Sequence, residues 1–177
     1  MRSIFLVAAV LLGACVGGPA SLQSRAEARI VRAASLPTVD FGEGVALKLT
    51  GEGHQAVSQL RLVERPGYRT PLHVHHETDE TFFVVSGELT LYVNGQTNKL
   101  GPGDYAFVPR GTPHAQGNQT TSESVILLTL VPGAFEGFFD DRAEMVLQTP
   151  PGHPDYTAGM MRVGRPYDIE ILGPAPY

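Results

Sequence analysis

The chain has 177 residues, of which 42% are hydrophobic, so it can bury the core of one domain with additions but not of two full domains. Its 13 Lys and Arg residues are outnumbered by 18 Asp and Glu residues, which leaves a net charge of −5. We find no Lys/Arg cluster of the kind that nucleic acid requires, and the sequence therefore argues against a nucleic-acid partner.

Residues 1–14 have the features of a signal peptide. Arg2 provides the positive start, and residues 4–12 form an apolar run that is too short to span a bilayer. The run ends in Leu12-Gly13-Ala14-Cys15, which resembles the lipobox of bacterial lipoproteins, and Cys15 is the only cysteine. We predict export to the cell envelope or periplasm, with a lipid on Cys15 as the only membrane attachment. A plain secretory signal that is cleaved further along is the alternative.

Residues 15–37 follow as a predicted tether of low order. Their opening is rich in glycine, and the alanine- and arginine-rich part at 24–34 has only a thin apolar stripe. The tether would separate a lipid anchor from the main domain, which we place at residues 38–132.

The main domain is predicted to consist of short strands between turns, because 20 Gly and 14 Pro residues are many for this length. Gly51-Glu52-Gly53 is a turn signal, and Asn94-Gly95 predicts a type I′ hairpin turn. The run at 125–131 has no charge, so we expect both of its faces to be covered, by the C-terminal segment or by the second subunit of a homodimer. The expected strands lie at 45–49, 57–63, 81–85, 89–93, 105–108 and 125–131.

Two groups of residues between 67 and 118 follow fixed spacings. The first contains Gly67, His73, His75, Glu80 and Gly87, and the second contains Gly103, Pro109, Gly111, His114 and Asn118. His73 and His75 are two residues apart, so on a strand both side chains project from one face. Glu80 is far enough along to reach the next strand, and His114 comes from a later one. A rolled antiparallel sheet would bring the four together.

Three imidazoles and one carboxylate suit a single divalent transition metal. Fe, Mn, Ni, Co, Cu and Zn all accept such ligands, and the sequence does not choose among them. Four protein ligands leave open positions on a five- or six-coordinate ion, which is typical of a catalytic site. Glu80 has two interpretations: it neutralises the charge of the metal, or it is also a catalytic base that takes a proton from a bound hydroxyl.

The two groups match every fixed position of the two consensus motifs of the cupin superfamily, which this chain therefore resembles over residues 67–118. The resemblance implies an all-β fold, a cupin (jelly-roll) β-barrel, here followed by a short C-terminal helical segment. It also implies that the metal lies inside the barrel on His73, His75, Glu80 and His114. A cupin barrel that keeps these residues without a metal is the alternative.

The residues around the ligands suggest the lining of a substrate pocket. Strict alternation from Glu80 places Phe82 and Val84 on the ligand face, and Phe107 could line the interior with them. Such a lining favours an apolar or aromatic organic substrate, although apolar residues also fill any small barrel. Three other histidines are expected at the surface: His54, His76 and His153.

Residues 133–177 are predicted to form a helical extension packed on the barrel. Phe135, Phe138 and Phe139 fall on one helical face of a stretch that runs to about Met145, and a second short helix is expected at 155–163. The stretch at 132–139 and the ending at 167–174 resemble small single-barrel cupins related to bacterial quercetin 2,3-dioxygenase. That resemblance, looser than the first, implies cleavage of flavonols with O₂ and a role for Glu80 as base.

Two classes of function remain after these observations. The first is a metal-dependent dioxygenase that acts on an aromatic or enolic small molecule. The second is an envelope protein that binds a metal or small ligand without turnover. Other cupin chemistry, such as isomerisation, decarboxylation or hydrolysis, is a further alternative.

Overall fold

The computed structural model describes residues 30–50 and 56–177. The predicted signal peptide, Cys15, most of the tether, the turn at residues 51–53 and His54 lie outside the described residues. Residues 31–177 form one unit, which begins with a short 3₁₀ helix, η1 (Ala33–Ser35).

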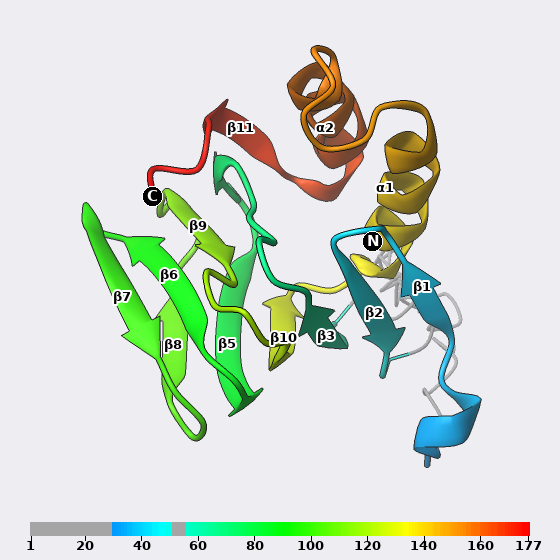
Figure 1. The fold of residues 1–177 in the computed structure, drawn as a ribbon. Helices are drawn as coiled ribbons and strands as arrows, with labels where there is room; N and C mark the ends of the chain where they lie inside the picture. Colours follow the sequence, from blue (N-terminus) through cyan, green and yellow to red (C-terminus); the bar gives the residue numbers. More distant parts are fainter. Residues whose placement is uncertain (1–29, 51–55) are drawn as a thin grey trace, which may run out of the picture. The chain divides into compact units, whose positions relative to one another are not determined.

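Two antiparallel sheets form the body of this unit (Figure 1). The six-stranded sheet has the order β1 (Thr38–Asp40), β2 (Gly44–Lys48), β3 (Ser58–Glu64), β10 (Ser124–Val131), β5 (Asp79–Ser86) and β8 (Tyr105–Val108). The five-stranded sheet has the order β11 (Glu170–Gly173), β4 (Leu72–Val74), β9 (His114–Gly117), β6 (Leu89–Val93) and β7 (Gln96–Leu100). This confirms the predicted all-β jelly-roll barrel, to which the structure adds β1, β7 and, from the C-terminal segment, β11.

The core lies between the two sheets, and strands such as β2 and β3 turn alternate side chains toward it. In β3 the burial pattern alternates along all seven residues, and Leu60 and Leu62 are fully buried. Phe82 on β5 and Leu89 on β6 are fully buried as well. Each such side chain stabilises the fold by roughly 1.5–3 kcal/mol relative to an exposed one.

Two of the turns have positive φ angles, which restrict the residues that can occupy them. Asn94 and Gly95 have φ angles of 53° and 77°, which confirms the predicted type I′ turn between β6 and β7. Gly87, the last glycine of the first spaced group, has φ 77°. A Cβ at that position would lie 2.7 Å from the carbonyl oxygen of Glu123, so the chain could not pass there with a larger residue.

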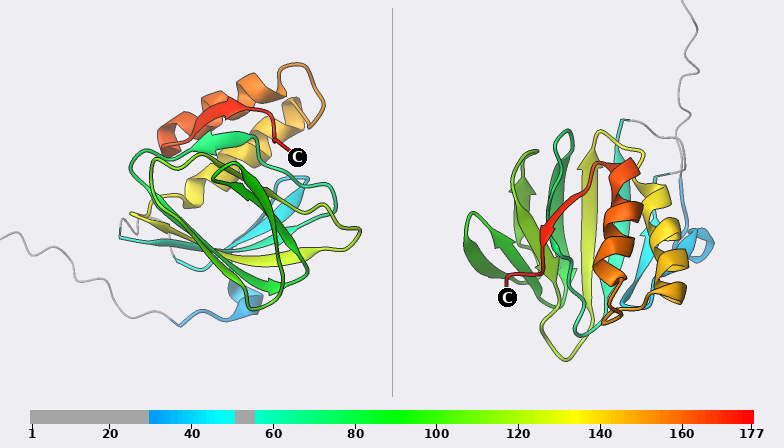
Figure 2. Two further views of the ribbon diagram at one scale, coloured as in Figure 1. Left: turned by 90° about the vertical axis from the view of Figure 1, so that its left-hand side faces the viewer. Right: turned by 90° about the horizontal axis from the view of Figure 1, so that it is seen from above.

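The C-terminal segment contains α1 (Glu136–Gln148), α2 (Tyr156–Gly164) and the 3₁₀ helix η2 (Arg165–Tyr167), ahead of β11. Both α-helices lie on the same side of the barrel (Figure 2). The helices and the clustered Phe138 and Phe139 were predicted, and the buried side of α1 continues through Arg142 and Met145. In the described ranges no helix is both long and apolar enough to cross a bilayer.

A buried carboxylate joins the start of α1 to the barrel. Glu136 accepts hydrogen bonds from the hydroxyl groups of Thr50, at 2.6 Å, and Ser58, at 2.9 Å. The Ser58 hydroxyl in turn accepts from the main-chain N–H of Phe135 at 2.9 Å. These contacts hold the first turn of α1, with its aromatic residues, against β3.

The outer face of the six-stranded sheet carries exposed apolar side chains on β5 and β8, among them Phe83, Tyr105 and Phe107. The prediction that residues 125–131 are covered on both faces holds only in part, because Val131 is 42% exposed. The homodimer suggested by the sequence stays a prediction.

Candidate metal centre

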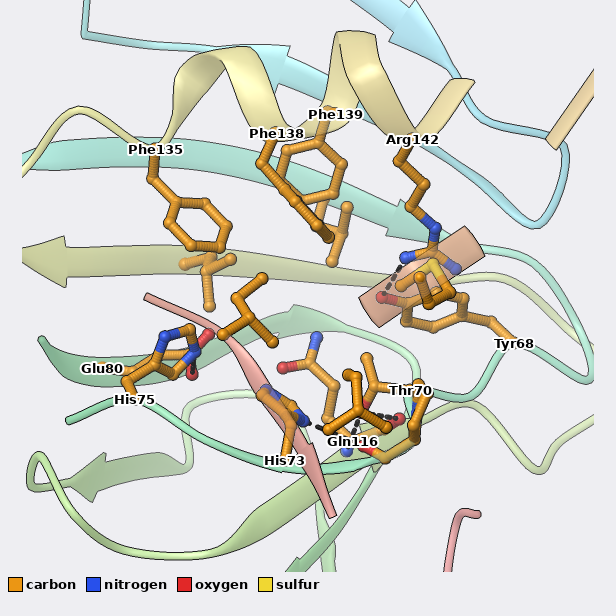
Figure 3. Close-up of a pocket in the computed structure, with 16 residues that line it drawn as sticks. Tyr68, Thr70, His73, His75, Glu80, Gln116, Phe135, Phe138, Phe139 and Arg142 are labelled. Atoms are coloured by element: carbon orange, nitrogen blue, oxygen red, sulfur yellow. Dashed lines mark hydrogen bonds and ion pairs between the residues drawn. The ribbon is translucent and has the colours of Figure 1, made fainter. Parts of the chain in front are cut away.

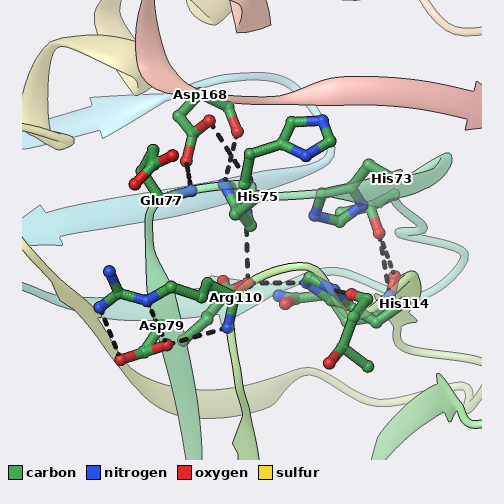
Figure 4. Close-up of polar contacts among 12 residues, drawn as sticks. His73, His75, Glu77, Asp79, Arg110, His114 and Asp168 are labelled. Carbon is green, nitrogen blue, oxygen red and sulfur yellow. Dashed lines mark hydrogen bonds and ion pairs between the residues drawn. The ribbon is translucent and has the colours of Figure 1, made fainter.

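The structure brings the four predicted ligands together from both sheets, and Figure 4 shows the three histidines among them. His73 lies on β4 directly opposite His114, the first residue of β9, and His75 follows the end of β4. Glu80 reaches the same place from β5, in the opposing sheet. All four side chains are buried, and one ligand atom from each lies within 4.8 Å of the others. The interior of the barrel thus holds a compact group of three nitrogen donors and one oxygen donor.

Each histidine ring is oriented by a hydrogen bond on its outer nitrogen. Nδ1 lies within hydrogen-bonding distance of a main-chain carbonyl oxygen in every case: 2.9 Å for His73 with Pro71, 3.1 Å for His75 with Asp168, and 2.9 Å for His114 with Thr112. A carbonyl oxygen only accepts, so Nδ1 carries the proton in all three rings. Nε2 is therefore the atom that each ring offers to a metal, which is the arrangement that metal-binding histidines adopt.

Glu80 lies where the histidine Nε2 atoms converge. Its Oε2 is 2.7 Å from Nε2 of His114 and 3.4 Å from Nε2 of His75. Burial alone would raise the pKa of Glu80, but the hydrogen bonds from His114 and His75 outweigh it and hold that pKa below its ordinary value. The carboxylate is thus ionised, as metal binding requires.

The same cluster shifts the pKa values of two of its histidines in opposite directions. Burial and the neighbouring histidines lower the pKa of His73 to about 3, so its imidazole is neutral. Burial also disfavours the charged form of His114, but the hydrogen bond to Glu80 and its negative charge raise the pKa of His114 above its ordinary value. Either a proton or a metal ion between Nε2 of His114 and Oε2 of Glu80 satisfies both groups. The donors therefore fit one divalent transition metal, whose identity they do not decide.

A cavity of about 40 Å³ adjoins three of the ligands, His73, His75 and Glu80 (Figure 3). Since a water molecule needs roughly 10–15 Å³, this space admits roughly three water-sized groups. One wall is the barrel, and the other is the C-terminal segment, which contributes Phe135, Phe138, Phe139, Arg142, Met160, Ile169 and Ile171. The helical extension thus completes the pocket, in addition to packing on the barrel.

Arg142 brings a buried positive charge to the cavity wall. It is 1% exposed, and its guanidinium stacks on Phe41 at 4.6 Å and donates to Glu43 at 2.7 Å. Weaker hydrogen bonds of 3.3 Å reach the hydroxyl groups of Tyr68 and Tyr156. Its Nε has no hydrogen-bond partner within the described part of the chain.

Gln116 is a second polar group in the cavity wall, two residues after His114 on β9. Its Nε2 donates to Oε1 of Glu64 at 3.0 Å, and the Ser124 hydroxyl donates to the other oxygen at 3.1 Å. Glu64 is completely buried, and burial raises its pKa to about 7 although both hydrogen bonds and the charge of Arg142 act in the opposite direction. Glu64 fixes the amide of Gln116 in place beside the ligand cluster.

The three residues predicted to line the substrate pocket do not line the cavity. Phe82 and Val84 are fully buried on the same side of β5 as Glu80, but they belong to the core and do not line the cavity. The prediction for Phe107 is wrong: its side chain is 55% exposed, because β8 turns Ala106 and Val108 inward. His76 and His153 are at the surface, as predicted.

The sequence contained a signal for Arg142, which the prediction missed. It lies three and four residues after Phe139 and Phe138, on the same helical face, so periodicity alone would turn it inward. Gln116 similarly follows His114 by two and shares its strand face. Glu64 and Asp168 had no comparable signal, because their partners are distant in the sequence.

Comparison with known proteins agrees with this geometry. A family model described as a cupin domain matches residues 61–131. The chain is 40% identical over 73 residues to an uncharacterized protein of Aquifex aeolicus, covering 41% of this chain and 59% of that one. It is 37% identical over 73 residues to quercetin 2,3-dioxygenase of Bacillus subtilis, covering 41% of this chain and 21% of the dioxygenase. The chain thus spans less than two thirds of the length of either relative.

Solved structures share the barrel. A sugar phosphate isomerase from Silicibacter pomeroyi superposes with a TM-score of 0.54 at 21% identity, over 59% of this chain and 76% of that one. A predicted oxalate decarboxylase from Thermotoga maritima gives 0.53 at 21%, over 59% and 100%. The barrel therefore has the cupin fold, and its His₃Glu group is a candidate metal centre. Because proteins with differently named activities share this fold, the fold alone does not identify the reaction.

Proposed function

We propose that this protein is a metal-dependent cupin enzyme, a dioxygenase that acts on an aromatic or enol-bearing small molecule. The observation that carries the proposal is the convergence of three imidazole groups and one carboxylate beside a largely apolar cavity. The partial similarity to the Bacillus subtilis dioxygenase supports the oxygenase assignment. A bound divalent metal would supply Lewis-acid and redox chemistry at this position.

The residues of the chain would bind the metal, accept a proton from the substrate and exclude water. The three histidines and Glu80 would hold the metal. Glu80, ionised and ordered by His75 and His114, would take the proton of the substrate hydroxyl as it approaches. Phe135, which packs against the His75 ring directly before α1, and Phe138 on α1 line the cavity and would exclude water from the site (Figure 3).

The size of the cavity limits the substrate. A flavonol has many more atoms than a space of about 40 Å³ accepts. The proposal therefore requires either a small enolic or phenolic substrate or an outward movement of the C-terminal segment. Of the two, a small substrate needs no change in the contacts that hold α1.

O₂ consumption by metal-loaded protein tests the proposal. The substrates would be small enediols, catechols and flavonols, each assayed with Fe, Mn, Ni, Co, Cu and Zn. Uptake that a chelator abolishes, that His114→Ala loses and that the matched surface variant His76→Ala retains supports a dioxygenase. Protein that binds metal but consumes no O₂ with any of these compounds overturns it, and favours a metal- or ligand-binding protein without turnover.

The small cavity also favours a second candidate, a cupin that moves a proton on a small substrate without O₂, as in isomerisation or decarboxylation. Here Glu80 would be the proton carrier, and Arg142 and Gln116 would contact the polar end of the substrate. Conversion of a small hydroxy or keto acid under strictly anaerobic conditions distinguishes this candidate from the first.

We also propose that the protein is exported and attached to the membrane by a lipid on Cys15, on the strength of Leu12-Gly13-Ala14-Cys15 and the absence of a second cysteine. Mass spectrometry of protein isolated from the membrane fraction of its own host tests this. A lipidated N-terminal Cys15 supports the proposal, and an unmodified N-terminus beyond residue 15 overturns it.

A further inference from the structure

Asp168 lies in a turn where the backbone adopts a conformation that is uncommon for residues other than glycine. It follows η2 directly and precedes β11, with φ 59° and ψ 34°, in the left-handed region. Aspartate tolerates this conformation better than most residues, whereas other non-glycine residues usually avoid it. The turn brings Asp168 against the end of β4, because β11 pairs with β4 in the five-stranded sheet.

Three contacts join Asp168 to three consecutive residues of that strand end (Figure 4). Its main-chain carbonyl oxygen accepts a hydrogen bond from Nδ1 of His75 at 3.1 Å. Its Oδ1 accepts from the main-chain N–H of His76 at 3.2 Å, and its Oδ2 accepts from the main-chain N–H of Glu77 at 2.7 Å. One residue thus holds both the ring of a ligand and the backbone that carries it.

His75 differs from the other two histidine ligands in this respect. His73 and His114 each take their carbonyl partner from two residues earlier in their own segment, so their orientation is a local property. His75 takes its partner from a residue 93 positions later in the chain. The barrel therefore orients two of the three rings through residues just ahead of β4 and β9, and the C-terminal segment orients the third.

We infer that Asp168 is a positioning residue for the metal centre: its carbonyl holds the His75 ring with Nε2 toward the metal, and its carboxylate anchors the turn at 76–77. The inference rests on the proposed metal site but not on the proposed reaction. It assigns to the C-terminal segment a role in metal affinity, in addition to forming one wall of the cavity. Outer partners of this kind typically change metal affinity by roughly 10–100-fold.

Three variants separate the parts of this role. Asp168→Gly keeps the carbonyl and suits the left-handed backbone but removes the carboxylate. Asp168→Ala removes the carboxylate and also strains the backbone, and Asp168→Asn keeps one acceptor oxygen. Glu170→Gln is the matched control, because it alters an exposed carboxylate on the same segment, bonded to His76 rather than to the ligand.

The measurements are the dissociation constant for Co²⁺, by competition with a chromophoric chelator, the visible spectrum of the bound Co²⁺, and thermal unfolding of the metal-free protein. We expect affinity to fall roughly 10–100-fold for Asp168→Gly and Asp168→Ala, less for Asp168→Asn, and not for Glu170→Gln. The Co²⁺ spectrum should change in the first two, because the geometry of one ligand changes.

Two outcomes overturn the inference. If Asp168→Gly binds Co²⁺ with wild-type affinity and spectrum, the carboxylate does not position His75, whatever its effect on thermal unfolding. If the wild-type protein binds no Co²⁺, both the inference and the metal centre are wrong. Wild-type protein that binds Co²⁺ but consumes no O₂ removes the dioxygenase proposal alone, and the effect of Asp168→Gly on affinity still decides the inference.

Discussion

The completely buried Glu64 should make the protein less stable as the pH rises. Its pKa is about 7 in the folded protein, against 4.5 for an ordinary glutamate, so between these values the folded state keeps a proton that the unfolded state has released. Protons bound preferentially by the folded state stabilise it at low pH, and this contribution is lost as the pH rises from 4.5 through 7. A shift of this size corresponds to about 3 kcal/mol in the free energy of unfolding.

The variant Glu64→Gln isolates this contribution because it is neutral at every pH and can still bond to Gln116 and Ser124. Urea unfolding of chelator-treated protein at pH 4.5, 6 and 8, at constant ionic strength, gives the free energy of unfolding of both proteins. The stability of the variant relative to wild type should rise by about 3 kcal/mol across this range.

A second variant tests the cause of the shift. Gln116→Met removes a hydrogen bond that lowers the pKa of Glu64, so the loss of stability should extend to higher pH than in wild type. If instead the free energies of unfolding of wild type and Glu64→Gln change in parallel between pH 4.5 and 8, the carboxyl group of Glu64 does not have a raised pKa and the reasoning fails.

The remaining predictions concern the metal site and the anchor. Alanine in place of His73, His75 or His114 should sharply lower the metal content measured by elemental analysis. The variant His76→Ala should leave the metal content unchanged, and an equal loss of metal in that variant would contradict the ligand assignment. Glu80→Gln should keep part of the metal but, per bound metal, lose roughly 10²–10⁴-fold in turnover, because an amide cannot accept a proton. Wild-type turnover in that variant would leave Glu80 a purely electrostatic role. Cys15→Ser should abolish lipid labelling and release the protein from membranes, and unchanged labelling would exclude Cys15.

The spacing of the two motifs, together with their resemblance to the cupin consensus, was sufficient to predict the barrel and its candidate ligand cluster. His73 and His75 share a strand face because strand side chains alternate, and the distances to Glu80 and His114 along the chain match the turns of a rolled sheet. The turn at Asn94-Gly95 and the aromatic face of α1 were predictable for the same reason, since each depends on residues only a few positions apart.

The limits of prediction appear where burial depends on long-range packing. Residues 105–108 alternate Tyr, Ala, Phe and Val, so the pattern does not say which pair faces inward; the pairing of β8 with β5 turns Ala106 in and Phe107 out. The cavity is similarly invisible in the sequence, because its two walls come from the barrel and from a segment that follows it.

The sequence by itself therefore determined which side chains are the candidate ligands, through the spacing of two motifs that match the cupin consensus. Only the tertiary structure decided how that group is completed: Glu64 is placed behind Gln116, and Asp168 supplies the carbonyl that orients His75. The physical reason is that a hydrogen bond between residues 93 positions apart depends on the packing of whole elements, and no local pattern of residue types encodes that packing.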